Sequence, residues 1–185
     1  MIAGYEASIR KIGATNSTAL VELWARVEAG LLSVEEFIDL AEILVVLGNE
    51  QAAHVARLSL AAVVADVTGG PLAPALTEPT GYLVDAGRAR RALETIAAGE
   101  AQAGVVKALE RLADNEPAAT GADVYGSGVR EVDGVRGWSR GLDADPCQLC
   151  QWWAADGRVY STESSMPRHT GCACVPVPVM STEES

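Results

Sequence analysis

The sequence predicts a mainly α-helical α+β fold, with a helical domain over residues 1–120 and a small β-rich module over residues 121–185. Three observations lead to this prediction. Apolar residues recur at helical spacing through the first 115 residues, and glycine and β-branched residues become frequent after residue 121. All four cysteines lie between residues 147 and 174. A chain of 185 residues suits one domain of ordinary size or two small ones.

The first helix is predicted within residues 16–32. Asn16 or Ser17 is the expected N-cap, because a short polar side chain can accept a hydrogen bond from the first turn of a helix. Four apolar residues follow at helical spacing, namely Leu20, Trp24, Val27 and Leu31. Gly30 suits the C-terminal cap. We expect Trp24 to lie in the core rather than to bind a ligand.

The second helix is predicted to begin at Ser33, because Glu36 three residues later completes a capping box. Its apolar stripe consists of Phe37, Leu40, Ile43, Leu44 and Leu47. We expect the segment LVVL, residues 44–47, to lie in the core. Beyond Gly48, residues 49–67 form either a third helix or an extension of the second, and their alanine-rich faces permit close approach of neighbouring helices.

A loop is predicted over residues 68–81, because two adjacent glycines and three prolines interrupt the helical pattern. Helical periodicity resumes over residues 82–99 and again over residues 100–114. The segment NEPAATG, residues 115–121, is expected to end the helical domain. The sequence therefore predicts roughly four or five helices, arranged as a bundle or as stacked helical hairpins.

Short strands are predicted within residues 121–144, where β-branched residues alternate with polar ones. The pair Asp133-Gly134 is expected to form a tight turn. The segment VPVPV must be extended because alternating prolines forbid a helix. The elements expected after residue 150 are one helical turn over residues 151–157, a strand over 158–162, the extended segment over 175–179 and a solvated acidic tail over 181–185.

Composition restricts the classes of function. The net charge of −11 disfavours general nucleic-acid binding, because contact with phosphate needs clustered Lys and Arg. No apolar run approaches the roughly 20 residues of a membrane span, and the N-terminus lacks the apolar segment of a secretory signal. We therefore expect synthesis in a cytosol, where thiols stay reduced, and this favours metal binding by clustered cysteines over disulfides.

The cysteines and one histidine have the spacing Cys147-x2-Cys150-x18-His169-x2-Cys172-x1-Cys174. A Cys-x2-Cys turn and a second pair from a distant loop can bind one tetrahedral zinc ion. The chain offers five candidate ligands for four positions, and the preferred set is Cys147, Cys150, His169 and Cys172, with Cys174 as the substitute. Four protein ligands leave no open position, so we predict a structural zinc that stabilises the small β-rich module.

Other interpretations of the cluster stay open or are disfavoured. Unpaired core thiols and disulfides that form late remain alternatives. A thioredoxin-like redox couple is disfavoured because no βαβ pattern surrounds the Cys-x2-Cys motif. A deaminase-type catalytic zinc needs an H-x-E motif before P-C-x2-C, but His54 is followed by Val55 and Ala56. His54 is interpreted as an ordinary helix residue.

The module resembles the C-terminal region of Mu F-like minor head proteins of tailed phages, in particular the actinobacteriophage type. The matching features are Trp138 and Arg140 before the Cys-x2-Cys motif, a Gly-x-Val-Tyr segment at residues 157–160, the His-x2-Cys-x-Cys motif and the Val-Pro-rich end. The resemblance covers residues 137–179. Residues 1–120 share with such proteins only their helical character and their position before the module.

The resemblance implies a structural virion protein rather than an enzyme. It implies a minor head protein, inside the capsid or at the portal, that assists head assembly or the packaging or ejection of the genome. The implied partners are the portal protein, the major capsid protein and other copies of the chain. The implied location is the host cytoplasm during assembly and then the virion.

Two other functions are kept as alternatives. A capsid maturation protease is the first, because such modules are fused to proteases in some phages. The sequence contains no G-x-S-x-G motif and no convincing Ser-His-Asp or Ser-Lys grouping. A zinc-dependent nucleic-acid-binding or regulatory protein is the second. It would use a local basic face made of Arg130, Arg136, Arg140, Arg158 and Arg168.

Overall fold

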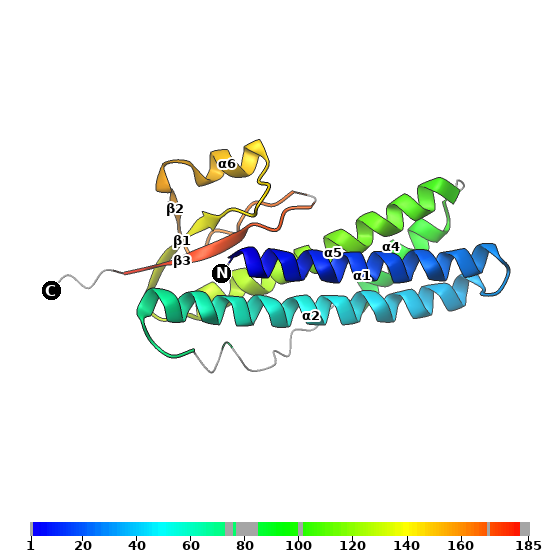
Figure 1. Cartoon of the computed structure of the whole chain (residues 1–185), viewed down its shortest axis with the longest axis horizontal. Helices are drawn as coiled ribbons and strands as arrows, with labels where there is room; N and C mark the ends of the chain where they lie inside the picture. The colour runs from blue at the N-terminus through cyan, green and yellow to red at the C-terminus, as the bar shows by residue number, and fades with distance from the viewer. Residues whose placement is uncertain (1, 73–75, 77–84, 100–101, 170, 182–185) are drawn as a thin grey trace.

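The computed structural model describes residues 2–72, 76, 85–99, 102–169 and 171–181 (Figure 1). Its helices are α1 (Ile2–Glu28), α2 (Val34–Thr68), α4 (Ala86–Ala97), α5 (Gln102–Glu131) and α6 (Gln148–Ala154), followed by a 3-10 turn (Ala155–Gly157). Its strands are β1 (Val135–Gly141), β2 (Val159–Tyr160) and β3 (Val175–Met180). The predicted mainly α-helical α+β fold is confirmed.

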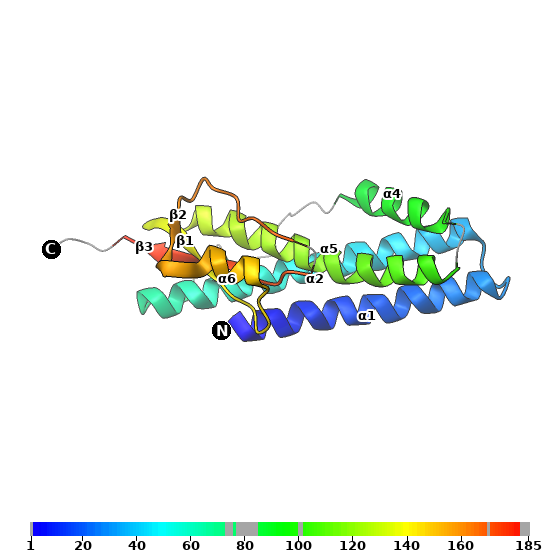
Figure 2. The same cartoon turned by 90° about the horizontal axis from the view of Figure 1, so that it is seen from above.

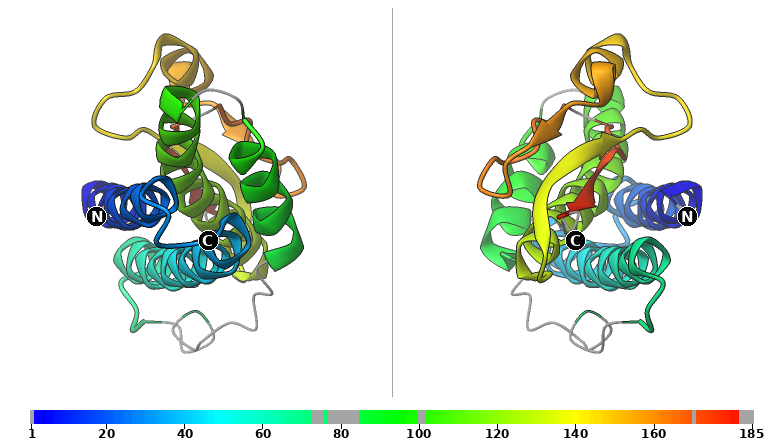
Figure 3. Two further views of the ribbon diagram at one scale, coloured as in Figure 1. Left: turned by 90° about the vertical axis from the view of Figure 1, so that its right-hand side faces the viewer. Right: turned by 90° about the vertical axis from the view of Figure 1, so that its left-hand side faces the viewer.

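The long helices form a bundle with the sheet at one end. Helices α1 and α2 run antiparallel, and α5 packs along both of them (Figures 1 and 2). The sheet and α6 lie at the end of the bundle where α1 begins, and α4 lies toward the other end. The end-on views show α1, α2, α4 and α5 arranged around a common interior (Figure 3). None of the described helices is both long and apolar enough to cross a membrane.

Helix α1 begins at Ile2, so the prediction of an N-cap at Asn16 or Ser17 is wrong. Asn16 lies buried in the middle of the helix, where its side chain faces Gly48 of α2. Tyr5 and Ile9, upstream of Asn16, are also buried, and they continue the apolar face toward the N-terminus. This burial stabilises the first four turns and overrides the local capping preference of Asn16.

The end of α1 confirms the predicted role of Gly30. The helix ends at Glu28, and Gly30 has the left-handed φ of 68° that suits glycine. The backbone N–H of Gly30 donates to the Val27 carbonyl at 3.0 Å, and that of Leu31 donates to the Arg26 carbonyl at 2.9 Å. This pair of bonds is a Schellman motif. Leu31 lies beyond the helix and is 77% exposed, contrary to its predicted place on the apolar face.

Helix α2 begins with the predicted capping box. The Ser33 hydroxyl accepts from the Glu36 N–H, and the Glu36 carboxylate accepts from the Ser33 N–H. The helix continues past Gly48 to Thr68, so residues 49–67 extend it and do not form a third helix. Trp24 of α1 and Phe37 of α2 are buried as predicted and pack edge to face.

The apolar residues predicted to form the buried face of α2 are divided between a buried and an exposed side of the helix. Phe37 and Val45 are buried, and Leu44 and Val46 are partly buried. Leu40, Ile43 and Leu47 are 43%, 56% and 48% exposed, so the expectation that Leu47 lies in the core is wrong. The buried face of the helix is instead formed by Ile38, Ala41, Val45, Ala52 and Ala53 together with Phe37. An apolar face of α2 is therefore left exposed.

Most of the predicted loop over residues 68–81 lies outside the described residues. Within it, α2 ends at Thr68, and Leu76 is buried against the core. The helix predicted over residues 82–99 is confirmed as α4, whose N-cap is Asp85, and residues 82–84 are not described. The helix predicted over residues 100–114 is confirmed from Gln102 onward as the start of α5.

Helix α5 runs on to Glu131, so the predicted end at residues 115–121 and the strands predicted up to residue 131 are wrong. Pro117 lies inside the helix and is fully buried. The residues after it form a buried stripe at helical spacing, Ala118, Ala122, Tyr125 and Val129. Packing of this stripe offsets the roughly 3 kcal/mol that an internal proline costs a helix. The division into domains at residue 120 stays a prediction, and α5 crosses it.

The sheet has the order β2-β1-β3, with both pairings antiparallel. Pro176 and Pro178 lie on the edge strand β3, where a residue without an N–H is tolerated, and the predicted extended segment is confirmed. Asp133-Gly134 connects α5 to β1 and does not close a hairpin. Trp138 of β1 stacks on Tyr160 of β2, with ring centroids 4.4 Å apart.

Candidate metal centre

Two segments far apart in sequence carry the cysteines and the histidine. Cys147 is the N-cap of α6, and its sulfur accepts from the Cys150 N–H at 3.5 Å. His169 and Cys172 form a turn in which the Cys172 N–H donates to the His169 carbonyl at 3.2 Å. Gly171 permits this turn because it has a φ of 77°. Cys174 directly precedes β3.

The structure brings all five predicted ligand residues together. His169 Nε2 lies 3.0 Å from Cys147 Sγ and 3.2 Å from Cys150 Sγ. Cys150 Sγ lies 3.7 Å from Cys172 Sγ. Two groups that could hold a metal ion result, Cys147–Cys150–His169 and Cys150–Cys172–Cys174, and within each the ligand atoms lie within 4.8 Å of one another. Cys150 belongs to both groups. The other histidine, His54, is exposed on α2 and belongs to neither.

These distances fit a tetrahedral ion bound by sulfur and nitrogen. Zinc–sulfur bonds of about 2.3 Å place two sulfur ligands about 3.8 Å apart. The Cys150–Cys172 separation of 3.7 Å matches this tetrahedral edge. Thiolate and imidazole are also the ligands that zinc and related soft ions prefer. The cluster therefore has the ligand chemistry of a metal centre, and its Cys150–Cys172 pair has the spacing of two zinc ligands.

Burial differs across the cluster. Cys150, Cys172 and Cys174 are buried, whereas Cys147 is exposed, and none of the four cysteines forms a disulfide. Leu142, Trp153 and Met166 pack against the buried sulfurs. One side of the centre is therefore closed by apolar side chains, and the Cys147 side faces solvent.

Hydrogen bonds between the sulfurs of Cys172 and Cys174 shift the pKa values of these two thiols in opposite directions. The bond with Cys174 lowers the pKa of Cys172 to about 5. The same bond, together with burial, raises the pKa of Cys174. A backbone hydrogen bond from Cys150 lowers the pKa of Cys147, and burial raises the pKa of Cys150 to about 12. Without metal, Cys172 is therefore the thiol of the buried pair that ionises first.

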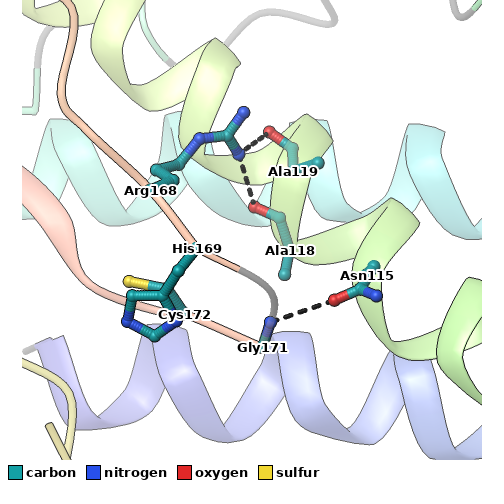
Figure 4. Close-up of a pocket in the computed structure, with 7 residues that line it drawn as sticks. All are labelled: Asn115, Ala118, Ala119, Arg168, His169, Gly171 and Cys172. Carbon is teal, nitrogen blue, oxygen red and sulfur yellow. Dashed lines mark hydrogen bonds between the residues drawn. The ribbon is translucent and has the colours of Figure 1, made fainter. Parts of the chain in front are cut away.

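The segment that carries His169 is anchored to α5. The Arg168 guanidinium donates to the Ala119 carbonyl at 2.8 Å and pairs with the Asp123 carboxylate at 2.9 Å. The Gly171 N–H donates to Asn115 Oδ1 at 3.0 Å (Figure 4). A pocket of about 380 Å³ lies between this segment and α5. Contacts of Arg168 and Gly171 with one helix thus fix the position of the His169 turn.

Sequence reasoning missed two carboxylates that support the segments around the ligands. Glu6 of α1 accepts from the Ala144 N–H at 2.7 Å, three residues before Cys147. Asp143 is buried and accepts from the Ala173 N–H at 3.1 Å, between Cys172 and Cys174. No local pattern could have found them, because each acts across a separation of 30 or more residues.

The predicted basic face is wrong at Arg140. This residue is only 5% exposed, and its Nη1 lies 3.4 Å from Cys150 Sγ and 3.9 Å from Cys172 Sγ. Arg168 is exposed and is bound to α5 as described above. Arg140 therefore serves contacts inside the protein. The sequence did contain a signal for the burial of Arg140. Arg140 lies two residues after Trp138, and residues two apart in a strand point to the same face.

The fold and the centre together define a helical protein whose C-terminal segment carries a Cys/His cluster able to hold a metal ion. All of the chain, residues 1–185, matches the model of the VG15 protein family. The chain belongs to this family, which is a family of viral proteins. Searches of curated proteins and of solved structures find no significant match.

Proposed function

We propose that the protein is a structural component of a phage head, a minor head protein of the Mu F-like type. Membership of a viral protein family supports the viral setting. The convergence of Cys147, Cys150, His169, Cys172 and Cys174 supports the resemblance of residues 137–179 most directly, because it places the shared motif in one site.

The cluster is proposed to bind one structural zinc ion. Cys147, Cys150, His169 and Cys172 supply four protein ligands, which leaves no coordination position for a substrate or for a reactive water. A closed site of this kind contributes to folding and not to catalysis. We accordingly propose a role without enzymatic activity.

The zinc would hold the C-terminal segment in place. Helix α6 has only 7 residues, and the described residues 161–169 and 171–174 form no helix or strand. Neither segment has an extensive apolar core of its own, so the free energy of metal binding is proposed to order both. The anchoring of Arg168 and Gly171 on α5 would then join the metal centre to the helical bundle.

The exposed apolar face of α2 is proposed to bind the portal protein. Leu40 and Ile43 line a groove of about 280 Å³ between α1 and α2, together with Ala19, Leu23 and Leu44. Ile43 and Leu47 line a second hollow beside it. Contiguous apolar patches of this kind usually mark an interaction site. The choice of the portal as partner comes from the resemblance. We further propose that the chain is incorporated into the head during assembly in the host cytoplasm and remains in the virion.

Isolation of procapsids tests this function. We expect the protein to co-purify with the portal protein, and Ile43→Asp to reduce its incorporation several-fold without changing its folding. Leu58→Asp is the matched control, because Leu58 is an exposed leucine of α2 that does not line either hollow. Absence of the wild-type protein from both procapsids and virions would sink the proposed role. Equal incorporation of the two variants would refute the docking face.

A further inference from the structure

Arg140 is a buried cation in direct contact with the sulfurs of the metal centre. It lies on β1, two residues after the buried Trp138, and is 5% exposed. Its Nη1 lies 3.4 Å from Cys150 Sγ and 3.9 Å from Cys172 Sγ. Its Nη2 donates to the Pro167 carbonyl, and the guanidinium lies 4.8 Å from the centroid of the Trp153 ring.

A buried guanidinium needs a negative partner, because removing an unpaired charge from water costs several kcal/mol. Among the described residues, no carboxylate forms an ion pair with Arg140. The neighbours of Arg140 that can carry a negative charge are therefore the sulfurs of Cys150 and Cys172. Both must carry negative charge when they bind a metal, since thiolates are the ligands.

The charges of the centre add up to zero when three cysteines and one histidine bind the ion, and not when four cysteines bind it. Three thiolates, one neutral imidazole and a divalent ion carry a net charge of −1, which Arg140 cancels. Four thiolates would leave −1 even after Arg140 is counted. The buried Asp143 carboxylate accepts from the Ala173 N–H, between Cys172 and Cys174.

We propose that Arg140 is a positioning residue that balances the charge of a metal centre made of Cys147, Cys150, His169 and Cys172. It holds the sulfurs of Cys150 and Cys172 in place and disfavours Cys174 as a fourth thiolate. This inference rests on the proposed zinc centre. A purely structural Arg140, present for its contacts with Pro167 and Trp153, would act independently of the charge of the ligands.

Zinc affinity of the full chain, measured by competition with a chelator, tests the contribution of Arg140. Arg140→Met keeps an unbranched apolar stem and removes the charged guanidinium, and we expect a loss of affinity of about 10- to 100-fold. Arg140→Lys keeps the charge and should lose less. Arg136→Met is the matched control, because Arg136 lies exposed on the same strand and should bind zinc as the wild type does.

A variant with a different set of metal ligands distinguishes charge balance from packing as the role of Arg140. Cys147→His replaces the exposed thiolate with a neutral imidazole, so the centre no longer needs a cation. In that background we expect Arg140→Met to cost at most a few-fold in affinity. The Co²⁺ form of each protein should show in its absorption spectrum the number of thiolate ligands that its sequence provides.

The following results of these experiments would contradict the inference. An equal loss of affinity from Arg140→Met in both backgrounds would assign Arg140 to packing alone. Circular dichroism at saturating zinc checks folding, and an Arg140→Met protein that stays unfolded there also contradicts a role in metal retention. Unchanged affinity of Arg140→Met refutes the inference but leaves the zinc centre standing. A wild-type chain that binds no zinc refutes both.

Discussion

Cys172 and Cys174 are separated by one residue but lie in opposite electrostatic surroundings. Cys172 lies 3.9 Å from the Arg140 guanidinium, whereas Cys174 follows the residue that donates to the Asp143 carboxylate. A cation stabilises a thiolate and a nearby carboxylate opposes one. Spacing alone left the two cysteines equivalent as fourth ligands, and their different neighbours are the reason why we propose Cys172.

Substitution of these cysteines tests which one binds the metal. Cys172→Ser should abolish stoichiometric zinc binding, because it removes one of four ligands from a closed site. Cys174→Ser should retain one zinc per chain, since Cys174 contributes only a hydrogen bond to Cys172. Metal analysis of both purified variants checks this. Retention of zinc by Cys172→Ser and its loss from Cys174→Ser would reverse the assignment.

Glu6 stabilises the folded state through its charge. Burial alone would raise the pKa of Glu6, but hydrogen bonds from the Ala144 N–H and from Arg10 outweigh it and hold the pKa below its usual range. A carboxyl whose pKa is lowered on folding contributes stability above its unfolded pKa of about 4.5, and this is lost as pH falls through the folded value.

The variant Glu6→Gln should therefore be less stable than the wild type at pH 7. The difference in the free energy of unfolding should shrink as the pH falls below about 4.5, because protonated Glu6 resembles glutamine. Denaturant titrations of both proteins between pH 7 and pH 3 measure this difference. A difference that is constant across the range would show that the charge of Glu6 contributes nothing.

At the scale of elements, the capping box at Ser33 is a local signal that the structure confirms. Ser33→Ala removes the hydroxyl that accepts from the Glu36 N–H and should destabilise the protein by about 1 kcal/mol. Ser17→Ala is the control. Since Ser17 lies inside α1, the substitution should be neutral or slightly stabilising. Thermal or denaturant unfolding compares the two, and a larger loss from Ser17→Ala would mean that a helix starts there.

Elements with local signals were predicted, and elements that depend on distant partners were not. The capping box of α2, the cap at Gly30 and the extended segment before Met180 all follow from neighbouring residues. The start of α1 and the passage of α5 through Pro117 depend on burial against other helices, which local propensity does not contain.

The residues of the candidate site also fall into those that the sequence could predict and those that it could not. The five candidate ligands could be found from their spacing, because the Cys-x2-Cys and His-x2-Cys motifs are short turns. Glu6 and Asp143 could not, since they reach the site from α1 and from a loop.

At the scale of the whole molecule, the metal centre lies beside one part of the core only. A core cluster formed by α1, α2, α4 and α5, which includes Trp24, Phe37 and Leu109, contains no residue after Ala113. The other cluster joins Tyr5 and Tyr125 to Trp138 and Val175, next to the cysteines. Removal of the metal should therefore affect the C-terminal segment first.

Chelation tests this division of the molecule. We expect a strong chelator to lower the melting temperature and to expose residues 142–174 to proteases, while most of the helical circular dichroism remains. Readdition of zinc should restore protection, which serves as the control for irreversible damage. Complete loss of helical signal on chelation would mean that the bundle does not fold without the metal.

The account depends most on the claim that Cys147, Cys150, His169 and Cys172 bind zinc as reduced ligands. The direct measurement is the metal content of the purified full chain, combined with a count of free thiols after denaturation with a chelator. We predict one zinc ion per chain and free thiols at all four cysteines. A chain with no metal and two disulfides would contradict the central claim.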